Sequence, residues 1–128
     1  MSRKVLVVDD EPDALAFVAS VLGDDYDVTT AGSADEGLAQ ARADVPNLMI
    51  LDVQMPGKDG FVLFDELGRD DALKDVPVVM LTGIAGKTGM KFSGEDMKEF
   101  IGRAPAAYLE KPIDPEALAQ TVTKVLNP

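Results

Sequence analysis

The chain of 128 residues contains no cysteine, no histidine and no tryptophan. The lack of cysteine excludes disulfides and thiolate chemistry, and the lack of histidine excludes an imidazole base or metal ligand. Basic residues are also few, with 12 Lys and Arg against 23 Asp and Glu, which gives a formal net charge of −11 at pH 7. A surface of this charge repels nucleic acid and anionic membranes, so we expect direct binding to neither.

Long hydrophobic runs are missing as well. No segment reaches the roughly 18 apolar residues in succession that cross a membrane. The first residues, 1–4, are followed by the short apolar run 5–8 and then by acidic residues, which is too little for a secretory signal. We therefore expect a cytoplasmic protein without membrane association. The chain is long enough to bury one core without a disulfide, and we expect a single domain over residues 1–128.

Short apolar runs alternate with segments of helical periodicity. Three runs are continuous, as in strands that are buried on both faces, and two weaker strand signals accompany them. The five predicted strands are Val5–Val8, Asp27–Ala31, Leu48–Leu51, Val78–Leu81 and Ala107–Leu109. Helices are predicted to begin near Pro12, Ser33, Phe61, Gly94 and Asp114. This alternation predicts an α/β fold: a doubly wound, five-stranded parallel sheet of the flavodoxin-like (βα)5 type, with strand order 2-1-3-4-5.

Local signals support several of the helix ends. Residues 33–36, Ser-Ala-Asp-Glu, have the pattern of a capping box. Residues 114–116, Asp-Pro-Glu, combine an N-cap, a proline at the first helical position and a first-turn acid. Gly23 is expected to end the first helix.

Reactive polar residues stand where four of these strands end. Asp9 and Asp10 follow the first strand, Asp52 follows the third, and Thr82 follows the fourth. Lys111 comes just after the last strand. Because the carboxyl ends of parallel strands share one edge of the sheet, these side chains are expected to form one site.

The chemistry of such a site points to a phosphoryl group. Three ionised carboxylates repel one another unless a cation or proton lies among them, and an all-oxygen ligand set suits Mg²⁺. Lys111 adds a point charge that is suited to phosphate. Asp52 is the candidate nucleophile, because aspartate forms covalent phosphoryl intermediates. Mg²⁺ and Lys111 then offset the charge on the transferred oxygens.

Each of these residues also has an ordinary interpretation when it is taken alone. An Asp-Asp pair after a strand commonly caps a helix, and lysines before proline are usually solvated. Tyr108 reads as a half-buried aromatic residue whose hydroxyl needs a partner. The joint occurrence of acids, hydroxyl and lysine at four strand ends favours the phosphoryl site.

Four segments resemble the signature segments of bacterial two-component response-regulator receiver domains of the chemotaxis-regulator type. The resemblance runs in order along nearly the whole chain. The segments are Val5–Pro12 (VLVVDDEP), Leu51–Gly60 (LDVQMPGKDG), Thr82–Gly83 (TG) and Tyr108–Pro112 (YLEKP).

The resemblance assigns the metal and phosphoacceptor roles. It implies that Asp52 is the phosphoacceptor, which becomes an aspartyl phosphate. Asp10 would bind Mg²⁺ directly and Asp9 would hold a coordinated water. Asp52 and the backbone carbonyl of Gln54 would complete the protein ligands.

Further roles follow from the same resemblance. Lys111 would pair with the phosphoryl group through a loop with a cis bond to Pro112, and Thr82 would hydrogen-bond the phosphoryl group. Tyr108 would turn inward when Thr82 moves. Gln54 and Ile84, each two residues beyond a site residue, would control water access and the lifetime of the phosphate.

The implied function is a phosphoacceptor receiver in a two-component phosphorelay. A sensor histidine kinase or a histidine phosphotransfer protein would phosphorylate Asp52 in a Mg²⁺-dependent reaction. Phosphorylation would switch the surface of the fourth helix, fifth strand and fifth helix for a downstream protein target, which the sequence does not identify. Such a protein is a switch rather than an enzyme with a separate substrate, although it assists its own phosphorylation and dephosphorylation.

The chain departs from the family pattern between Thr82 and Lys111, where the spacing is several residues longer than usual. We expect an extended loop at about 83–94 before the fourth helix, and Lys87 or Lys91 within it is a candidate to approach the acidic edge. The sequence leaves open whether the chain is a free-standing regulator or a part of a longer protein.

Two other functional classes remain as alternatives. A phosphohydrolase with an aspartate nucleophile shares the sheet and the metal, but it usually carries an acid two residues after the nucleophile, where Gln54 stands. A pseudo-receiver binds partners without phosphorylation, but it typically lacks part of the acidic set that is complete in this chain.

Overall fold

A computed structural model of the chain describes residues 3–53, 60–82 and 105–127. Five strands and four helices lie in these ranges, and they alternate as predicted from β1 to β4 and from β5 to α6. They are β1 (Lys4–Val8), α1 (Pro12–Leu22), β2 (Asp27–Ala31), α2 (Ala34–Ala43), β3 (Leu48–Asp52), α3 (Gly60–Gly68), β4 (Val78–Thr82), β5 (Ala107–Glu110) and α6 (Pro115–Leu126). The helix predicted near Gly94 and the extended loop at 83–94 lie outside the described residues.

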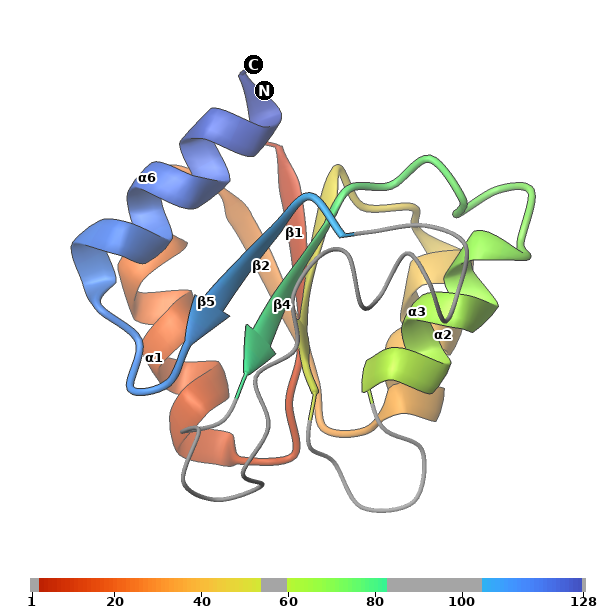
Figure 1. Cartoon of the computed structure of the whole chain (residues 1–128), viewed down its shortest axis with the longest axis horizontal. Helices are drawn as coiled ribbons and strands as arrows, with labels where there is room; N and C mark the ends of the chain where they lie inside the picture. Colours follow the sequence, from red (N-terminus) through yellow and green to blue (C-terminus); the bar gives the residue numbers. More distant parts are fainter. Residues whose placement is uncertain (1–2, 54–59, 83–104, 128) are drawn as a thin grey trace.

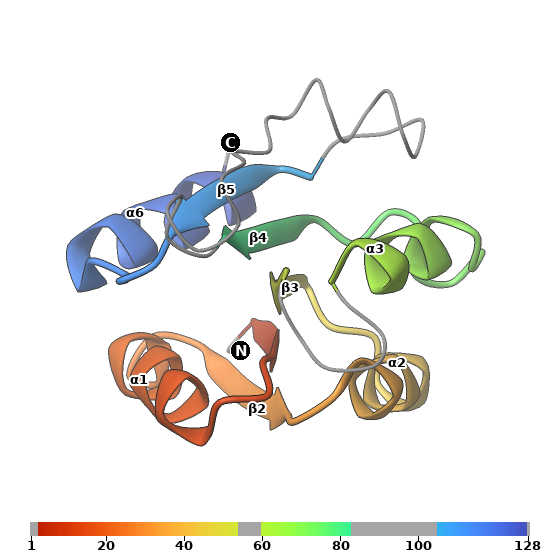
Figure 2. The same cartoon turned by 60° about the horizontal axis from the view of Figure 1, so that its bottom comes forward.

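The sheet has five parallel strands in the order β2-β1-β3-β4-β5, which confirms the predicted flavodoxin-like topology. Figures 1 and 2 show α1 and α6 covering one face of the sheet, while α2 and α3 cover the other. Parallel strands require crossover connections, and because all five strands run in the same direction, their carboxyl ends lie at one edge of the sheet. The carboxyl ends of β1, β3, β4 and β5 therefore meet at the same edge.

The core is divided by the sheet into two hydrophobic clusters. Val5 and Val7 of β1 point to the cluster under α1 and α6, and Leu6 and Val8 point to the cluster under α2 and α3. Because both faces are covered, every residue of β3 is buried, and the apolar runs of the central strands are continuous. Burying one such side chain stabilises the fold by about 1.5–3 kcal/mol.

The helix starts agree with the sequence signals, with differences in detail. The Ser33 hydroxyl oxygen accepts a hydrogen bond from the Glu36 N–H at 3.2 Å, as a capping box requires. The Glu36 carboxylate, however, accepts from the Gly32 N–H at 3.0 Å rather than from the N–H of Ser33. Asp114 caps α6 through the Ala117 N–H at 2.9 Å.

The first helix ends differently from a typical glycine stop. Gly23 is its C-cap, as predicted, but its backbone is right-handed with φ −64° and ψ −21°. The glycine therefore ends the helix without the left-handed conformation that usually selects glycine at this position.

Candidate functional site

The three predicted acidic residues come together at the carboxyl edge of the sheet. Val8 of β1 pairs with Leu51 of β3, so the residues that follow each of them stand at the same level on neighbouring strands. One carboxylate oxygen from each of Asp9, Asp10 and Asp52 lies within 4.8 Å of the others. Asp9 and Asp52 are buried, whereas Asp10 is exposed. The structure thus confirms that these residues form one acidic group.

Lys111 reaches this group from the end of β5, as predicted. Its Nζ donates a hydrogen bond to Asp9 Oδ2 at 2.9 Å and lies 3.4 Å from Asp52 Oδ1. Burial alone would lower the pKa of Lys111, but the hydrogen bond to Asp9 and the charges of Asp52, Asp9 and Glu11 outweigh it and raise the pKa above its ordinary value. The ammonium is therefore charged at neutral pH. The peptide bond to Pro112 is cis, which confirms that expectation.

Hydrogen bonds to three described residues hold Asp9 in place. Its N–H donates to the Ala31 carbonyl at 3.1 Å, and its Oδ1 accepts from the Glu11 N–H at 3.0 Å. Lys111 occupies the other carboxylate oxygen. Glu11 thus contributes to the site in two ways: its backbone N–H binds Asp9, and its charge acts on Lys111. Neither contribution was predicted from the sequence.

Thr82 and Tyr108 lie on the neighbouring strands β4 and β5. The Thr82 hydroxyl donates a weak, long hydrogen bond to the Leu109 carbonyl at 3.4 Å, and the Thr82 carbonyl accepts from the Lys111 N–H at 2.9 Å. Tyr108 is partly buried against the cluster under α2 and α3. The partly buried position predicted for Tyr108 is thereby confirmed. The hydroxyl of Thr82 is linked to the same strand that carries Tyr108.

Several predicted residues lie outside the described part of the chain. These are Gln54 and Ile84, which were expected to control phosphate lifetime, and Lys87 and Lys91. Their roles stay predictions.

The donor set fits a hard divalent cation. Among the described residues, the Lys111 ammonium contacts two of the three carboxylates, those of Asp9 and Asp52, so negative charge remains to be balanced. All candidate donors are oxygens, which Mg²⁺ prefers, and the exposed Asp10 gives access from solvent. Asp9, Asp10 and Asp52 are the described residues that would hold the ion.

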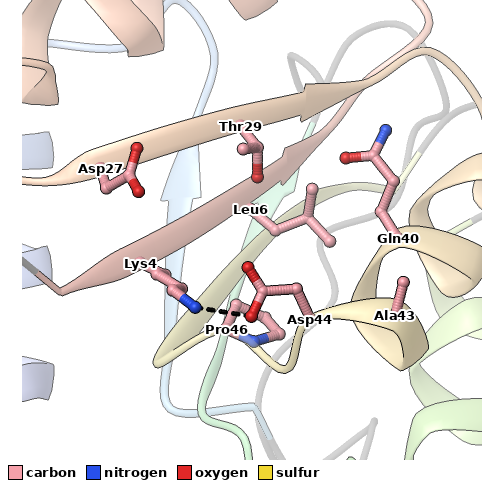
Figure 3. Close-up of a pocket in the computed structure, with 8 residues that line it drawn as sticks. All are labelled: Lys4, Leu6, Asp27, Thr29, Gln40, Ala43, Asp44 and Pro46. Carbon is pink, nitrogen blue, oxygen red and sulfur yellow. Dashed lines mark hydrogen bonds and ion pairs between the residues drawn. The ribbon is translucent and has the colours of Figure 1, made fainter.

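A separate hollow of about 210 Å³ lies between β1, β2 and the end of α2. Figure 3 shows its lining residues, among them Lys4, whose Nζ is 2.6 Å from Asp44 Oδ1. Lys4 and Asp27 begin their strands, so this hollow is at the opposite edge from the acidic group. It takes no part in the site described above.

Comparisons with known proteins agree with the fold and the site. The family model described as the response regulator receiver domain matches residues 5–123. The response regulator PleD of Caulobacter vibrioides is 36% identical over 115 residues, which make up 89% of this chain and 24% of PleD. The solved structure of the chemotaxis protein CheY4 of Vibrio cholerae has a TM-score of 0.82 and 30% identity, and the match covers 98% of this chain and 99% of CheY4.

A third relative, NtrX from Brucella abortus, has a solved structure with a TM-score of 0.81 and 32% identity over 98% of this chain and 27% of NtrX. This chain therefore belongs to the response regulator receiver domain family, and its function is that of a phosphoacceptor in two-component signalling. It spans about a quarter of the length of PleD and of NtrX. None of the helices among the described residues is long and apolar enough to cross a membrane.

Proposed function

We propose that Asp52 is the residue that accepts the phosphoryl group, with Mg²⁺ bound beside it. The observation that carries the proposal is the position of its carboxylate. It is buried at the end of β3, in one group with Asp9 and Asp10 and 3.4 Å from the Lys111 ammonium. Burial holds this nucleophile in place, and the nearby ammonium can offset the negative charge of the phosphoryl group during transfer.

The phosphodonor in this proposal is a histidine kinase or a histidine phosphotransfer protein. An Asp52 carboxylate oxygen forms the new O–P bond, while the P–N bond to the donor's imidazole breaks and its electron pair stays on the imidazole nitrogen, which takes up a proton. Mg²⁺, when bound, supplies charge stabilisation for the phosphoryl oxygens. Lys111 moves its ammonium toward those oxygens, and its hydrogen bond to Asp9 is the contact that it gives up.

The switch that follows involves Thr82 and Tyr108. The Thr82 hydroxyl exchanges its long bond to the Leu109 carbonyl for a bond to the phosphoryl group. The ring of Tyr108 then turns inward. The changed surface of this part of the molecule, including the end of β5, binds a downstream protein target.

The test of this function compares wild type with Asp52→Asn after incubation with Mg²⁺ and acetyl phosphate, by intact mass. One phosphoryl adduct that requires Mg²⁺ and is missing in Asp52→Asn is expected. Steady release of phosphate with turnover supports the phosphohydrolase alternative instead. No adduct, together with no binding of beryllofluoride, supports the pseudo-receiver alternative.

The protein also assists the loss of its own phosphate in this proposal, at a rate set by Gln54 and Ile84. A bulky apolar residue at position 84 is expected to hinder the attacking water, so Ile84→Ala should hydrolyse its aspartyl phosphate faster than wild type. Decay of the phosphorylated mass after removal of the donor measures this rate. An unchanged or slower rate in Ile84→Ala contradicts the role of Ile84.

Three further expectations complete the proposal. Residues 1–128 act as a single receiver domain, for which limited proteolysis should give one resistant fragment.

Lys87→Ala and Lys91→Ala should change Mg²⁺ affinity or phosphorylation rate if either lysine approaches the acidic edge, and unchanged values remove that idea. A cytoplasmic site of action, where kinase and receiver can meet, is tested by cell fractionation.

A further inference from the structure

Gly60, the first residue of α3, lies against the backbone at the end of β3. Its N–H donates a hydrogen bond to the Val53 carbonyl at 3.1 Å. A Cβ atom placed on Gly60 would be 2.3 Å from the Asp52 carbonyl oxygen and 3.0 Å from both the Asp52 carbonyl carbon and Val53 Cα. Real side chains almost never approach other atoms this closely, so any side chain at position 60 forces a shift of the structure.

Space, rather than backbone conformation, requires glycine at this position. The φ angle of Gly60 lies outside the left-handed region. All three nearest atoms belong to backbone, so no change of rotamer relieves the contact. Close approach of two backbone segments is one of the situations that only glycine permits.

The same backbone segment is also held by pairing with β4. Asp52 pairs with Leu81 of β4, and the Val53 N–H donates to the Leu81 carbonyl at 2.9 Å. The segment 52–53 is therefore in contact with both β4 and Gly60. It cannot move away from a new side chain without weakening its pairing with β4.

We infer that Gly60 is a positioning residue that sets where the Asp52 carboxylate stands relative to Lys111 and Asp9. The inference rests on the proposed function of Asp52. The Asp52 side chain is only 3% exposed, so a displaced carboxylate has no free solvent into which it can adjust. Because phosphoryl transfer depends on alignment, a displacement of about 1 Å is expected to lower the rate by up to about a hundredfold.

Gly23 provides a matched control for the substitution. A Cβ atom on Gly23 would also meet backbone, 2.6 Å from the Ala19 carbonyl oxygen. Gly23 follows α1 and precedes β2, so it lies at the amino edge of the sheet, away from the acidic group. Gly23→Ala therefore introduces a similar backbone contact without touching Asp52.

The experiment compares wild type, Gly60→Ala and Gly23→Ala. Folding is checked by circular dichroism, Mg²⁺ affinity is measured by calorimetry, and phosphorylation by acetyl phosphate is followed by intact mass at saturating Mg²⁺. We expect folded Gly60→Ala to lose about tenfold to a hundredfold in phosphorylation rate and to bind Mg²⁺ more weakly. Gly23→Ala should stay near wild type in both. Equal values for Gly60→Ala and wild type, or an equal loss in Gly23→Ala, overturn the inference.

Two readouts do not depend on phosphorylation. In Mg²⁺-free ¹H–¹⁵N spectra, the amide chemical-shift changes caused by Gly60→Ala should concentrate at Asp52, Val53 and Lys111. Changes that are spread evenly over the sheet contradict a positioning role.

If Gly60→Ala does not fold, hydrogen exchange of the wild-type amides tests the inference instead. The Gly60 N–H should be as protected as that of Val53, and rapid exchange overturns the inference.

The outcome also separates this inference from the proposed function. A wild-type protein that takes up no phosphoryl group on Asp52 overturns the proposed function, whereas the effect of Gly60→Ala on Mg²⁺ affinity and on the Asp52 amide would still stand. Normal phosphorylation of both wild type and Gly60→Ala overturns the role of Gly60 alone.

Discussion

Lys111 Nζ donates a hydrogen bond to Asp9 Oδ2 across 102 positions of the sequence. The lysine follows β5 and the aspartate follows β1, with β3 and β4 between these two strands in the sheet. Asp9 is fully buried and the Lys111 side chain is 20% exposed. The ammonium thus serves as a counter-charge for Asp9 and, at 3.4 Å, for Asp52.

Replacing this lysine with a residue of similar length removes the counter-charge. In Mg²⁺-free buffer at pH 7, Lys111→Met should lower the free energy of unfolding by about 1–3 kcal/mol, because buried carboxylates lose a charged partner. Saturating Mg²⁺ should restore more stability in Lys111→Met than it adds to wild type. Urea unfolding with EDTA and with Mg²⁺ measures both effects.

The control for that prediction is Lys74→Met. Lys74 Nζ is 3.7 Å from Asp71 Oδ1 on an exposed surface, and such pairs contribute about 0–1 kcal/mol. An equal loss of stability in Lys74→Met and Lys111→Met would contradict the role given to Lys111.

The link between Thr82 and β5 predicts a spectroscopic effect. Tyr26→Phe leaves Tyr108 as the single tyrosine of the chain, so its fluorescence reports on β5 alone. Beryllofluoride with Mg²⁺ should change this emission in Tyr26→Phe and in Tyr26→Phe with Thr82→Ser, which keeps the hydroxyl. Thr82→Ala should abolish the change while beryllofluoride still binds, as ¹⁹F NMR can verify. A full change in the Thr82→Ala protein would show that the hydroxyl is not the link.

Gly37 of α2 predicts a case in which packing opposes helix propensity. Alanine is better than glycine in a helix by about 1 kcal/mol. A Cβ on Gly37, however, would lie 2.6 Å from Val8 Cγ2, a buried methyl group held by the sheet. We expect Gly37→Ala to lower the free energy of unfolding by about 1–2 kcal/mol, because overpacking of a core costs about 1–3 kcal/mol.

A double-mutant cycle separates the two contributions at Gly37. Val8→Ala removes the methyl groups that the new Cβ would meet, so it should cost less stability in the Gly37→Ala background than in wild type. Urea unfolding of the four proteins gives the coupling. If the changes in the free energy of unfolding are additive, or if Gly37→Ala is more stable than wild type, α2 shifts away from Val8 of β1 without a measurable cost.

Asp70 gives a prediction about pH. The hydrogen bond from Arg42 Nε, at 2.9 Å, and the bond from the Ala72 N–H hold the pKa of Asp70 below its ordinary value of 3.8. A lowered folded pKa means that the carboxylate stabilises the fold above the unfolded pKa, and that this contribution is lost as the pH falls through the folded value. Asp70→Asn should therefore show a constant loss of stability at neutral pH that shrinks below pH 3.8.

Asp71→Asn is the neighbouring control for the pH series, because Asp71 is fully exposed. At neutral pH its loss of stability should be smaller than that of Asp70→Asn. A deficit in Asp70→Asn that persists unchanged in strong acid would assign the effect to the amide side chain rather than to the lost charge.

The site could be predicted in outline because its parts are marked by local pattern. A buried apolar run that leads into Asp9 or Asp52 predicts a strand and its carboxyl end. The parallel topology then brings these carboxyl ends to the same edge of the sheet. The preference of Lys111 for Asp9 over Asp52 could not be predicted, since it depends on the distances between strands that pair only in the folded state. The same is true of Glu36, which bonds to Gly32 rather than to Ser33.

Close contacts between backbone segments were also hidden from the sequence. Gly60 directly precedes the predicted helix start at Phe61, and nothing in the local sequence shows that a Cβ at position 60 would lie 2.3 Å from the Asp52 carbonyl oxygen. Only the packing of α3 against the end of β3 makes that contact visible.

The acidic group exists only in the native protein, because Asp9 and Asp52 stand at the ends of two different strands, β1 and β3, that lie side by side after folding. A cation held by these carboxylates therefore binds the native state and has little affinity for the denatured ensemble. By mass action, such a ligand adds about 2.7 kcal/mol to stability when its free concentration is a hundred times its dissociation constant. The resistance of this small domain to unfolding is then set in part by the ionic composition of its surroundings.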